Sequence, residues 1–582
     1  MQAKKLVLAV IAAAATLASF TQRMAAQPGL VGPRFNHVLL LSIDGMHAVD
    51  FYNCAQGIAG VNGGDPYCPN LAALGQNGIN YVATISSTPS DSFPGLAALV
   101  TGGSAKTHGL YYDVAYDRSL APPATTTGTG LPGGTCTPYE AATGTTTDYD
   151  QGIELDDTML NGGAVGAAPT EGTAASIDPN KLVRNPDAGC APVYPWDFVR
   201  TNTIFSVVHG AGGYTAWIDK HASYSFVAGP GGTGLNDYYS PEVDSTVIPL
   251  PGITTPQGVS CATIADPGAD LSSWTASFTN IQCYDALKVN ALLNQIAGKT
   301  HNGAAAQVPE LFGMNFQAVY IGQSVNEPTV GAGGYQNAAA LPTTPLLNNI
   351  EFVDSEIGVI VKALQAAGIY DNTLIIVTAK HGESPIDPAA FVVPGTTPAT
   401  LLGSAIPVSE SPTSGGIGAT EDDVSVIWLV PGSSVTDAVA VLEKNAAAIG
   451  LGEINYGPTL ALNYNVGGLG AGQDPRTPDI IVTPNVGVTY GVSGVQGDHG
   501  GFGHDDTNVI LLVANPSFAA QTVSVTTRTA QVAPTILEAL GLDVNALDAV
   551  RAEGTQALPE VEAQRRVRFG QIPMRSAKPV MK

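Results

Sequence analysis

The apolar run from Val38 to Ile43, which ends in Asp44 and Gly45, constrains the fold more than any other segment. An apolar stretch of this length, closed by a turn signal, predicts a strand that is buried on both faces of a parallel sheet. Ligands of open α/β sheets bind just beyond the carboxyl ends of such strands, so Asp44 is a candidate metal ligand. The alternative is that Asp44 and Gly45 form only a turn.

Residues 84–112 contain a hydroxyl-rich turn that leads into a short apolar helix and a glycine-rich loop. Ser92 is expected at the start of this helix. Backbone N–H groups and the positive end of the helix dipole favour an anion there, so Ser92 is placed to attack a bound anionic ester. Ser90, Asp91 and Ser92 are also all good helix caps, and capping is the commoner role of an isolated serine.

Four segments together resemble the alkaline phosphatase superfamily, most closely its type I phosphodiesterase and nucleotide pyrophosphatase branch. The resemblance implies that Asp44, His381 and His499 bind metal and that Ser92 attacks phosphorus. Unmatched inserts separate the segments, which span residues 37 to 513. The segments are Ile43-Asp44-Gly45; Ser92-Phe93-Pro94 with Val100-Thr101-Gly102 and His108-Gly109; residues 374–382; and His499-Gly500-Gly501-Phe502 with Asp505 and Asp506.

A fifth segment, residues 203–221, resembles the helix, glycine turn and strand that bring a lysine and a histidine to the transferred group in sulfatases of the same superfamily. The resemblance implies that Lys220 and His221 bind the anion or donate a proton. The alternative is a solvated lysine and a histidine on a loop. A sulfatase further requires Cys/Ser-x-Pro-x-Arg, and Leu96 stands where that arginine belongs, which argues against a sulfatase.

The sequence departs from the two-zinc members of the superfamily at two places. Those members carry Asp-x-x-Gly-His on a strand in the middle of the chain, and the corresponding apolar run here, residues 316–323, lacks this pattern. Lys380 replaces the aspartate of the family's Asp-His-Gly. An ammonium group cannot ligate a metal, but it can stand where a cation would have stood. We therefore expect one metal ion, or an ion in an altered position, assisted by fixed positive side chains.

The remaining candidates form a chemically consistent set. Asp44, Ser92 as an alkoxide, His381, His499 and Asp498 are the expected metal ligands. The histidines favour zinc, whereas a shell dominated by carboxylates would favour calcium or magnesium. Metal coordination makes a serine hydroxyl reactive near neutral pH. Lys220, His221 and Lys380 would then stabilise the transferred group and protonate the leaving group, with a covalent phosphoseryl intermediate on Ser92.

The overall charge excludes one class of partner. The chain has 24 basic and 49 acidic residues, a formal charge of −25, so binding of nucleic acid or an anionic membrane through a basic surface is not expected. Its 582 residues, 44% of them hydrophobic, can bury a large core. The sequence does not indicate an oligomeric state.

The N-terminus predicts export. Lys4 and Lys5 precede the apolar run Leu6–Ala18 and several small residues, a pattern typical of a signal peptide over residues 1–26. An uncleaved anchor is the alternative, and no other segment is long and apolar enough to span a membrane. A secreted or periplasmic destination fits six cysteines, for which three local disulfides are the simplest pairing. The expected pairs are Cys54 with Cys68, Cys136 with Cys190, and Cys261 with Cys283.

The fold expected from these elements is α/β: a doubly wound, mostly parallel sheet flanked by helices, with a small α/β cap insert and long loop insertions. A helix over 350–368 feeds a strand at 374–378, and a last strand at 509–513 precedes a helix over 532–540. The expected boundaries are a first core part at 37–395 with inserts at 121–195 and 226–285, a cap at 396–485, a closing core part at 486–560 and a tail at 561–582.

The predicted function is hydrolysis of a small-molecule phosphoester. The sequence favours a phosphodiester or a nucleotide pyrophosphate as the substrate. Two alternatives stay open. One is a sulfatase-like or other ester hydrolase. The other is a catalytically degraded member that acts as a binding protein, as the missing ligands in the middle strand and Lys380 would permit.

Overall fold

The computed structural model describes residues 35–149, 152–155, 172–244, 253–261, 274–405, 419–430, 432–491, 494–562 and 564. Its centre is an eight-stranded sheet with the strand order β19-β2-β18-β13-β1-β10-β8-β9. The strands are β1 (His37–Ile43), β2 (Gly78–Tyr81), β8 (Ala216–Ile218), β9 (Asp237–Tyr239), β10 (Leu311–Phe316), β13 (Thr373–Thr378), β18 (Leu511–Ala514) and β19 (Gln521–Val523).

Most neighbours in this sheet are parallel. β1 pairs in parallel with both β10 and β13, and β10, β8 and β9 continue the parallel set. Only β18 runs against its neighbours β13 and β2. The carboxyl ends of β1, β10, β13 and β8 therefore meet at one edge, where an α/β sheet places its ligands.

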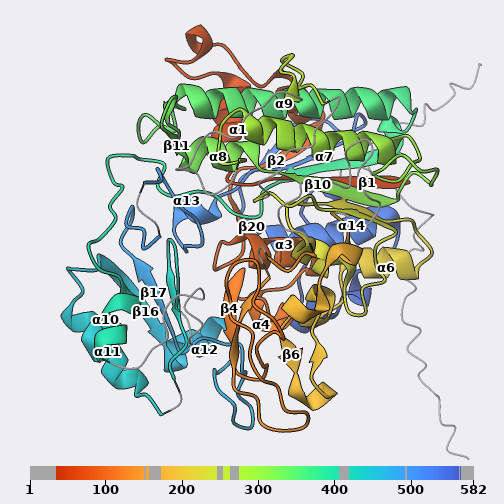
Figure 1. Cartoon of the computed structure of the whole chain (residues 1–582). Coiled ribbons are helices and arrows are strands. Elements are labelled where there is room, and N and C mark those ends of the chain that lie inside the picture. Colours follow the sequence, from red (N-terminus) through yellow and green to blue (C-terminus); the bar gives the residue numbers. More distant parts are fainter. Residues whose placement is uncertain are drawn as a thin grey trace, which may run out of the picture.

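Helices cover both faces of the sheet, as the doubly wound prediction requires (Figure 1). Side chains alternate along β1: Leu39, Leu41 and Ile43 enter the core on one face, and Val38 and Leu40 enter the core on the other. The first face carries α1 (Ala48–Gln56), α7 (Asn280–Ile296), α8 (Ala318–Ser324) and α9 (Thr344–Ala366), and the second carries α3 (Ser92–Thr101), α6 (Ile204–Gly210) and α14 (Val532–Leu540).

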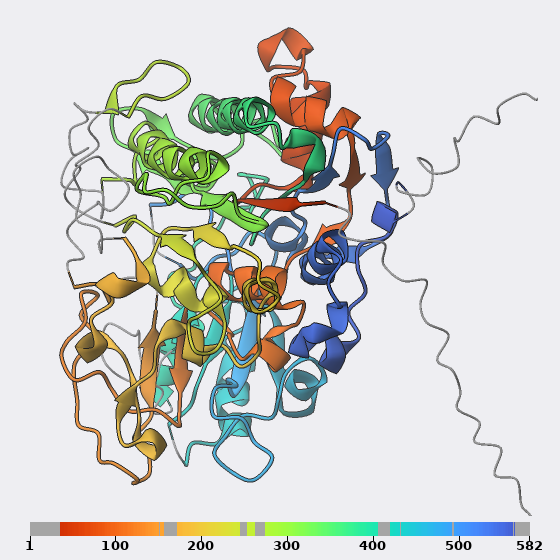
Figure 2. The same ribbon diagram turned by 90° about the vertical axis from the view of Figure 1, so that its right-hand side faces the viewer.

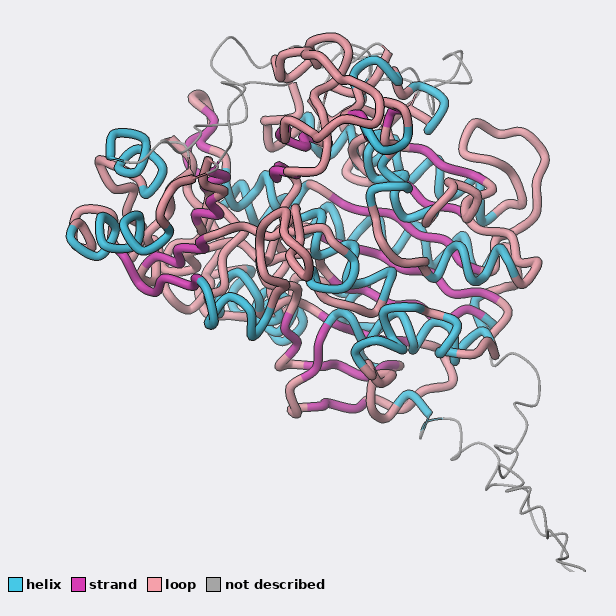
Figure 3. Tube along the Cα trace, turned by 90° about the horizontal axis from the view of Figure 1, so that it is seen from below, coloured by secondary structure: helices cyan, strands magenta, loops and turns pink. Residues whose placement is uncertain are grey.

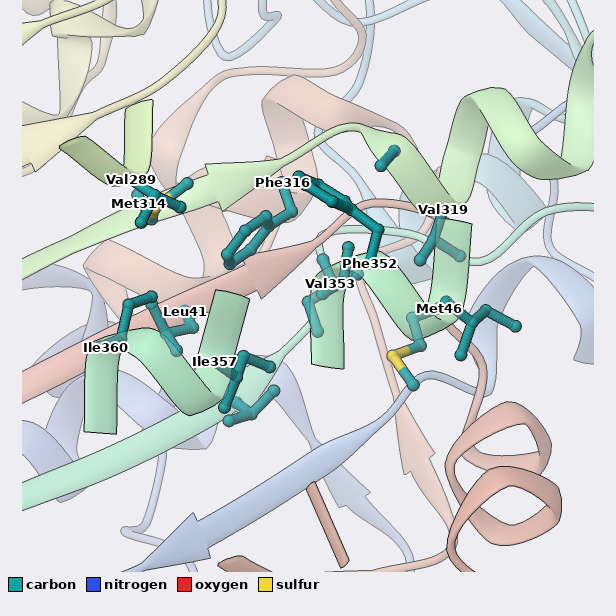
Figure 4. Close-up of a cluster of buried hydrophobic side chains, with 14 of the residues drawn as sticks. Leu41, Met46, Val289, Met314, Phe316, Val319, Phe352, Val353, Ile357 and Ile360 are labelled. Carbon is teal, nitrogen blue, oxygen red and sulfur yellow. The ribbon is translucent and has the colours of Figure 1, made fainter. Parts of the chain in front are cut away.

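The first face has a densely packed core. Helices α7, α8 and α9 contact one another, and Figure 2 shows the green helices α7 and α9 side by side above the sheet. Each large apolar side chain fully buried here contributes about 1.5–3 kcal/mol to stability. Figure 4 shows part of this core, with Leu41 of β1, Met314 and Phe316 of β10, Val319 of α8, and Phe352, Val353 and Ile357 of α9.

The predicted elements recur with three differences. The run 316–323, treated in the sequence as the middle strand, is mostly helix: the strand β10 ends at Phe316 and α8 begins at Ala318. Helix α9 begins at Thr344, before the predicted start at residue 350, with Pro345 in its first turn. In addition, β9 adds an edge strand to the central sheet from within residues 226–285, which the sequence indicated as loop.

A second, smaller sheet lies to one side of the central one (Figures 1 and 3). Its strand order is β14-β15-β17-β16, all antiparallel, and we call it, with its helices, the cap. The strands are β14 (Ala419–Glu421), β15 (Ser425–Ile427), β16 (Leu451–Tyr456) and β17 (Ile480–Pro484), and the helices are α10 (Pro398–Ala405), α11 (Val435–Lys444) and α12 (Gly457–Asn463).

Three arginine–carboxylate pairs join the cap to loops of the core, and both partners contribute arginines. From the core side, Arg200 binds Asp474 through two hydrogen bonds of 2.7 Å. From the cap side, Arg476 donates to the buried Asp117 at 2.8 Å. The third pair joins Arg118 to Asp479. Because bidentate and buried pairs fix geometry, the cap has a defined orientation on the core.

Three disulfides are present and match the predicted pairs, Cys54–Cys68, Cys136–Cys190 and Cys261–Cys283. The predicted signal peptide, residues 1–26, and most of the tail at 561–582 lie outside the described residues. Within the described part of the chain, we find no helix with both the length and the apolar character needed to cross a bilayer.

Candidate active site

Asp44 follows directly on β1 and is fully buried. Its backbone N–H donates to the carbonyl of Phe316, at the end of β10, and the N–H of Gly45 donates to the carbonyl of His381, just after β13. Gly45 has a φ of 79°, and a Cβ there would lie 1.9 Å from the side chain of Gln323. The sharp turn after β1 therefore requires glycine and holds Asp44 between the neighbouring strand ends.

Ser92 begins α3, whose cap is Asp91. The Oγ of Ser92 lies 3.2 Å from Nε2 of His381 and accepts a hydrogen bond of 3.2 Å from Nζ of Lys220. Nδ1 of His381 lies 2.8 Å from the carbonyl of Gly382 and donates to it, so Nε2 is the ring nitrogen that faces Ser92. A serine hydroxyl between an imidazole nitrogen and an ammonium group, at a helix N-terminus, is suited to attack an anionic ester.

One carboxylate oxygen of Asp44 carries most of its contacts. Oδ2 lies 3.2 Å from Nζ of Lys380, 3.6 Å from Nε2 of His381 and 3.9 Å from Nζ of Lys220. Burial alone would raise the pKa of Asp44, but Lys380, His381 and Lys220 hold that pKa well below its usual value. Asp44 therefore stays ionised throughout the neutral range.

The middle strand contributes amides to the same oxygen. Nε2 of Gln317 donates to Oδ2 of Asp44 at 2.6 Å, and Nδ2 of Asn315 donates at 3.2 Å. The sequence indicated only that the metal ligands expected on this strand were missing. What replaces them, a pair of neutral hydrogen-bond donors, was not predicted.

Lys380 is fully buried between two carboxylates and an aromatic ring. Its Nζ contacts Asp44 and lies 3.4 Å from Oδ1 of Asp219. The Nζ also lies 4.4 Å from the ring centre of Tyr224, a distance typical of a cation–π contact. With Lys220 beside Ser92, two ammonium groups lie on this side of the nucleophile, together with the carboxylates of Asp44 and Asp219.

His499 lies on the opposite, acidic side of the site. Its ring stacks on that of His381, with the ring centres 3.8 Å apart. Its nitrogens lie 3.6 Å from Oδ1 of Asp91, 3.5 Å from Oε2 of Glu383 and 3.8 Å from Oδ1 of Asp498. Burial, with His381 and Lys220 nearby, holds the pKa of His499 well below its usual value, so the imidazole is neutral and able to bind a metal.

These acidic groups are costly to bury together. Burial and the charge of Asp498 raise the pKa of Glu383 well above its usual value, and burial with Asp422 does the same to the pKa of Asp498. Burial raises the pKa of Asp91 to about 6, against the opposing effect of His381. Raised carboxyl pKa values mark a cluster that lacks nearby positive charge.

The acidic side fits a metal ion. His381, Glu383 and His499 each offer a ligand atom, and these atoms lie within 4.8 Å of one another. Among the described residues, four buried polar atoms of this cluster have no hydrogen-bond partner: both carboxylate oxygens of Glu383, Nδ1 of His499 and Oδ1 of Asp91. Buried polar groups are normally paired, so unpaired ligand atoms around one point indicate a cation site. Glu383, two residues beyond His381, was not among the predicted residues.

His221 lies against a buried carboxylate. Its Nδ1 lies 2.7 Å from Oε1 of Glu242, and its ring stacks on Tyr224. The structure thus brings together Asp44, Ser92, Lys220, Lys380 and His381 at one point, with His499 and Asp498 on the acidic side. The role predicted for His221, which contacts Glu242, stays a prediction.

Comparison with known proteins gives a family match over part of the chain. Residues 38–132, which contain Asp44 and Ser92, match the family model of type I phosphodiesterase / nucleotide pyrophosphatase. The match confirms the predicted resemblance and agrees with the prediction of a hydrolase. No curated protein matches the sequence.

Three solved structures are similar to the chain. The murine ectonucleotide pyrophosphatase / phosphodiesterase 5 aligns with 14% identity and a TM-score of 0.49, over 87% of this chain and 96% of that chain. An inactive variant of the murine protein in complex with AMP aligns with 13% identity and a TM-score of 0.48, over 87% of this chain and 96% of that chain. The human protein aligns with 12% identity and a TM-score of 0.48, over 87% of this chain and 95% of that chain.

Proposed function

We propose that this chain, which carries the type I phosphodiesterase segment of the alkaline phosphatase superfamily over residues 38–132, is a secreted, metal-dependent hydrolase of phosphodiester or nucleotide pyrophosphate bonds. The observation that carries the proposal is the position of the Ser92 Oγ, 3.2 Å from both Nε2 of His381 and Nζ of Lys220 at the start of α3.

The reaction runs in two steps on Ser92. In the first, Oγ forms a bond to phosphorus while the bond from phosphorus to the leaving oxygen breaks. Nε2 of His381 receives the hydroxyl proton, and the leaving oxygen takes up a proton from solvent to depart as an alcohol or a phosphate. In the second, water attacks the same phosphorus and the bond from phosphorus to Oγ breaks. Oγ takes back the proton held on His381, the water gives up a proton to solvent, and a phosphomonoester is released. The ammonium of Lys220, in contact with Oγ, is placed to stabilise negative charge on the phosphoryl oxygens.

A divalent ion has a suitable set of ligands on the acidic side. Glu383 and His499 would hold it, while Nε2 of His381 stays with the hydroxyl of Ser92. An imidazole beside a carboxylate favours zinc over calcium or magnesium. A bound ion would polarise a phosphoryl oxygen and lower the cost of charge at the nucleophile.

The disulfides and the N-terminal sequence support a location outside the cytoplasm. Three disulfides are formed within the chain, and such bonds persist in oxidising compartments. Together with the signal-like N-terminus, they favour a secreted or periplasmic enzyme that acts on a small phosphoester. The sulfatase alternative is weaker because Leu96 occupies the position of a required arginine.

The test is hydrolysis of an aryl phosphodiester and an aryl phosphomonoester by the zinc-loaded protein. We expect faster turnover of the diester and, after acid quenching, a covalent adduct on the Ser92 peptide that retains the second ester group. Ser92→Ala should abolish both. Ser87→Ala is the matched control, because Ser87 lies in the same turn and its hydroxyl donates to the carbonyl of Pro89. No turnover of either ester, or unchanged turnover in Ser92→Ala, would overturn the proposal and favour a binding protein.

A further inference from the structure

We infer that the ammonium of Lys380 permanently occupies the cation position at Asp44, so that this site binds a single metal ion, on the side of His499 and Glu383. The inference rests on the proposed function and concerns how its site is charged. The inference removes Asp44 from the predicted metal ligands, because Asp44 then forms an ion pair with Lys380.

The position of Lys380 leaves little room for an ion. Its Nζ lies 3.2 Å from Oδ2 of Asp44 and 3.4 Å from Oδ1 of Asp219, and none of the three side chains is exposed. A zinc ion binds carboxylate oxygen at about 2.0–2.2 Å, so it would share this oxygen with an ammonium group in contact with it. Repulsion between two cations in a buried site is severe.

The remaining contacts of Oδ2 point to the same conclusion. Gln317 and Asn315 both direct N–H donors at this oxygen, at 2.6 Å and 3.2 Å. With Lys380, three hydrogen-bond donors surround this one oxygen. Such a set of donors stabilises an ionised carboxylate and occupies the positions from which a metal would bind the oxygen. Oδ1 of Asp44 has no hydrogen-bond partner among the described residues, and any ion at Asp44 would have to bind there.

The amides are held in place by a second buried ion pair. Nζ of Lys288 lies 3.0 Å from Oδ1 of Asp285 and donates to the carbonyl of Asn315 at 2.6 Å. Asp285 in turn accepts hydrogen bonds from the backbone N–H of Gln317 and of Ala318, at the start of α8. The turn from β10 to α8 is thereby fixed with both amides facing Asp44.

A fixed ammonium differs from a metal in its consequences. It cannot be removed by a chelator or exchanged for another ion, and it neutralises the charge of Asp44 at any metal concentration. The metal requirement of the enzyme then belongs entirely to the acidic side, where Glu383 and His499 have ligand atoms without partners among the described residues.

The test is the zinc content of purified protein after equilibration with zinc and removal of excess ion, measured by elemental analysis alongside thermal unfolding. Wild type should retain one equivalent. Asp44→Asn should also retain one, whereas Glu383→Gln should lose most of it. Lys380→Asp restores the carboxylate of Asp-His-Gly and should raise the content to two, and Lys380→Met, which only removes the charge, should leave it at one.

Two results would overturn the inference. One is a wild type with two equivalents that falls to one in Asp44→Asn. The other is a folded Lys380→Asp protein, with a cooperative unfolding transition, that stays at one. If Lys380→Asp does not fold, wild type and Asp44→Asn alone decide the question. Because zinc content is read without turnover, an enzyme inactive on both aryl esters would count against the proposed function and leave this result standing.

Discussion

Nζ of Lys380 and Oδ2 of Asp44 lie 3.2 Å apart, at the carboxyl ends of two neighbouring parallel strands, β13 and β1. This pair divides the site into a cationic side, with Lys220 and Lys380, and an acidic side around His499. Ser92 contacts Lys220 on the cationic side. It also contacts His381, whose ring stacks on that of His499 on the acidic side.

Lys220→Met should lower kcat for the aryl diester by about 10²–10³-fold, because the ammonium that contacts the nucleophile would stabilise charge in the transition state. Steady-state kinetics on zinc-loaded protein measures the effect. Lys106→Met is the control, since Lys106 is exposed on α4 (Ala105–His108) and should leave kcat unchanged. A rise in KM with unchanged kcat would show that Lys220 stabilises the bound substrate and the transition state equally.

Glu383→Gln should weaken zinc binding at least about 10-fold with little change in the fold, because the amide keeps the shape of the side chain and loses a charged ligand. Competition with a chelating dye measures the affinity. Glu553→Gln on the exposed end of α15 (Asp548–Glu553) should bind zinc as wild type does. Equal affinities in the two variants would exclude Glu383 as a ligand.

Asp117→Asn should destabilise the protein by about 2–4 kcal/mol, because it leaves the largely buried guanidinium of Arg476 without its carboxylate. Urea unfolding measures the free energy. Replacing both residues, as Asp117→Asn with Arg476→Met, should cost less than the single change. A single variant as stable as wild type would show that the pair does not hold the cap.

Glu356 on α9 should make stability depend on pH. Burial and the nearby Asp285 raise its pKa from 4.5 to about 8, so the folded state keeps a proton that the unfolded state has lost between these values. Its contribution is therefore full below 4.5 and falls as pH rises to about 8, by a few kcal/mol at about 1.4 kcal/mol per pKa unit. Glu356→Gln should flatten the unfolding free energy over this range, and an unchanged profile would contradict the assignment.

The sequence was sufficient to predict the elements whose pattern is local. The apolar run that forms β1, the strand β13 before Lys380 and the helix α14 from Val532 to Leu540 all have a clear periodicity or clear boundaries. The positions of Asp44, Ser92 and His381 followed, because the carboxyl ends of parallel strands meet at one edge.

The rest depends on contacts that no local pattern encodes. Gln317 and Asn315 reach Asp44 only because Asp285 and Lys288, on a helix some 30 residues earlier in the chain, fix the turn after β10. Glu383 could have been noticed as a carboxylate two residues after a candidate ligand, but its burial beside His499 required the fold. The run 316–323 is apolar enough for a strand or a helix, and its length could not decide between them.

The buried carboxylates around His499 have a thermodynamic consequence for the proposed enzyme. Without a cation, their raised pKa values leave these carboxyls either negatively charged or neutralised by bound protons, and neither form attracts a phosphoester; with a cation they become part of an attractive site. Metal and substrate should therefore bind cooperatively, and linkage requires each to increase the affinity of the other by the same factor. Substrate would then protect the enzyme from a chelator, and scarce metal would appear in kinetics as a raised KM.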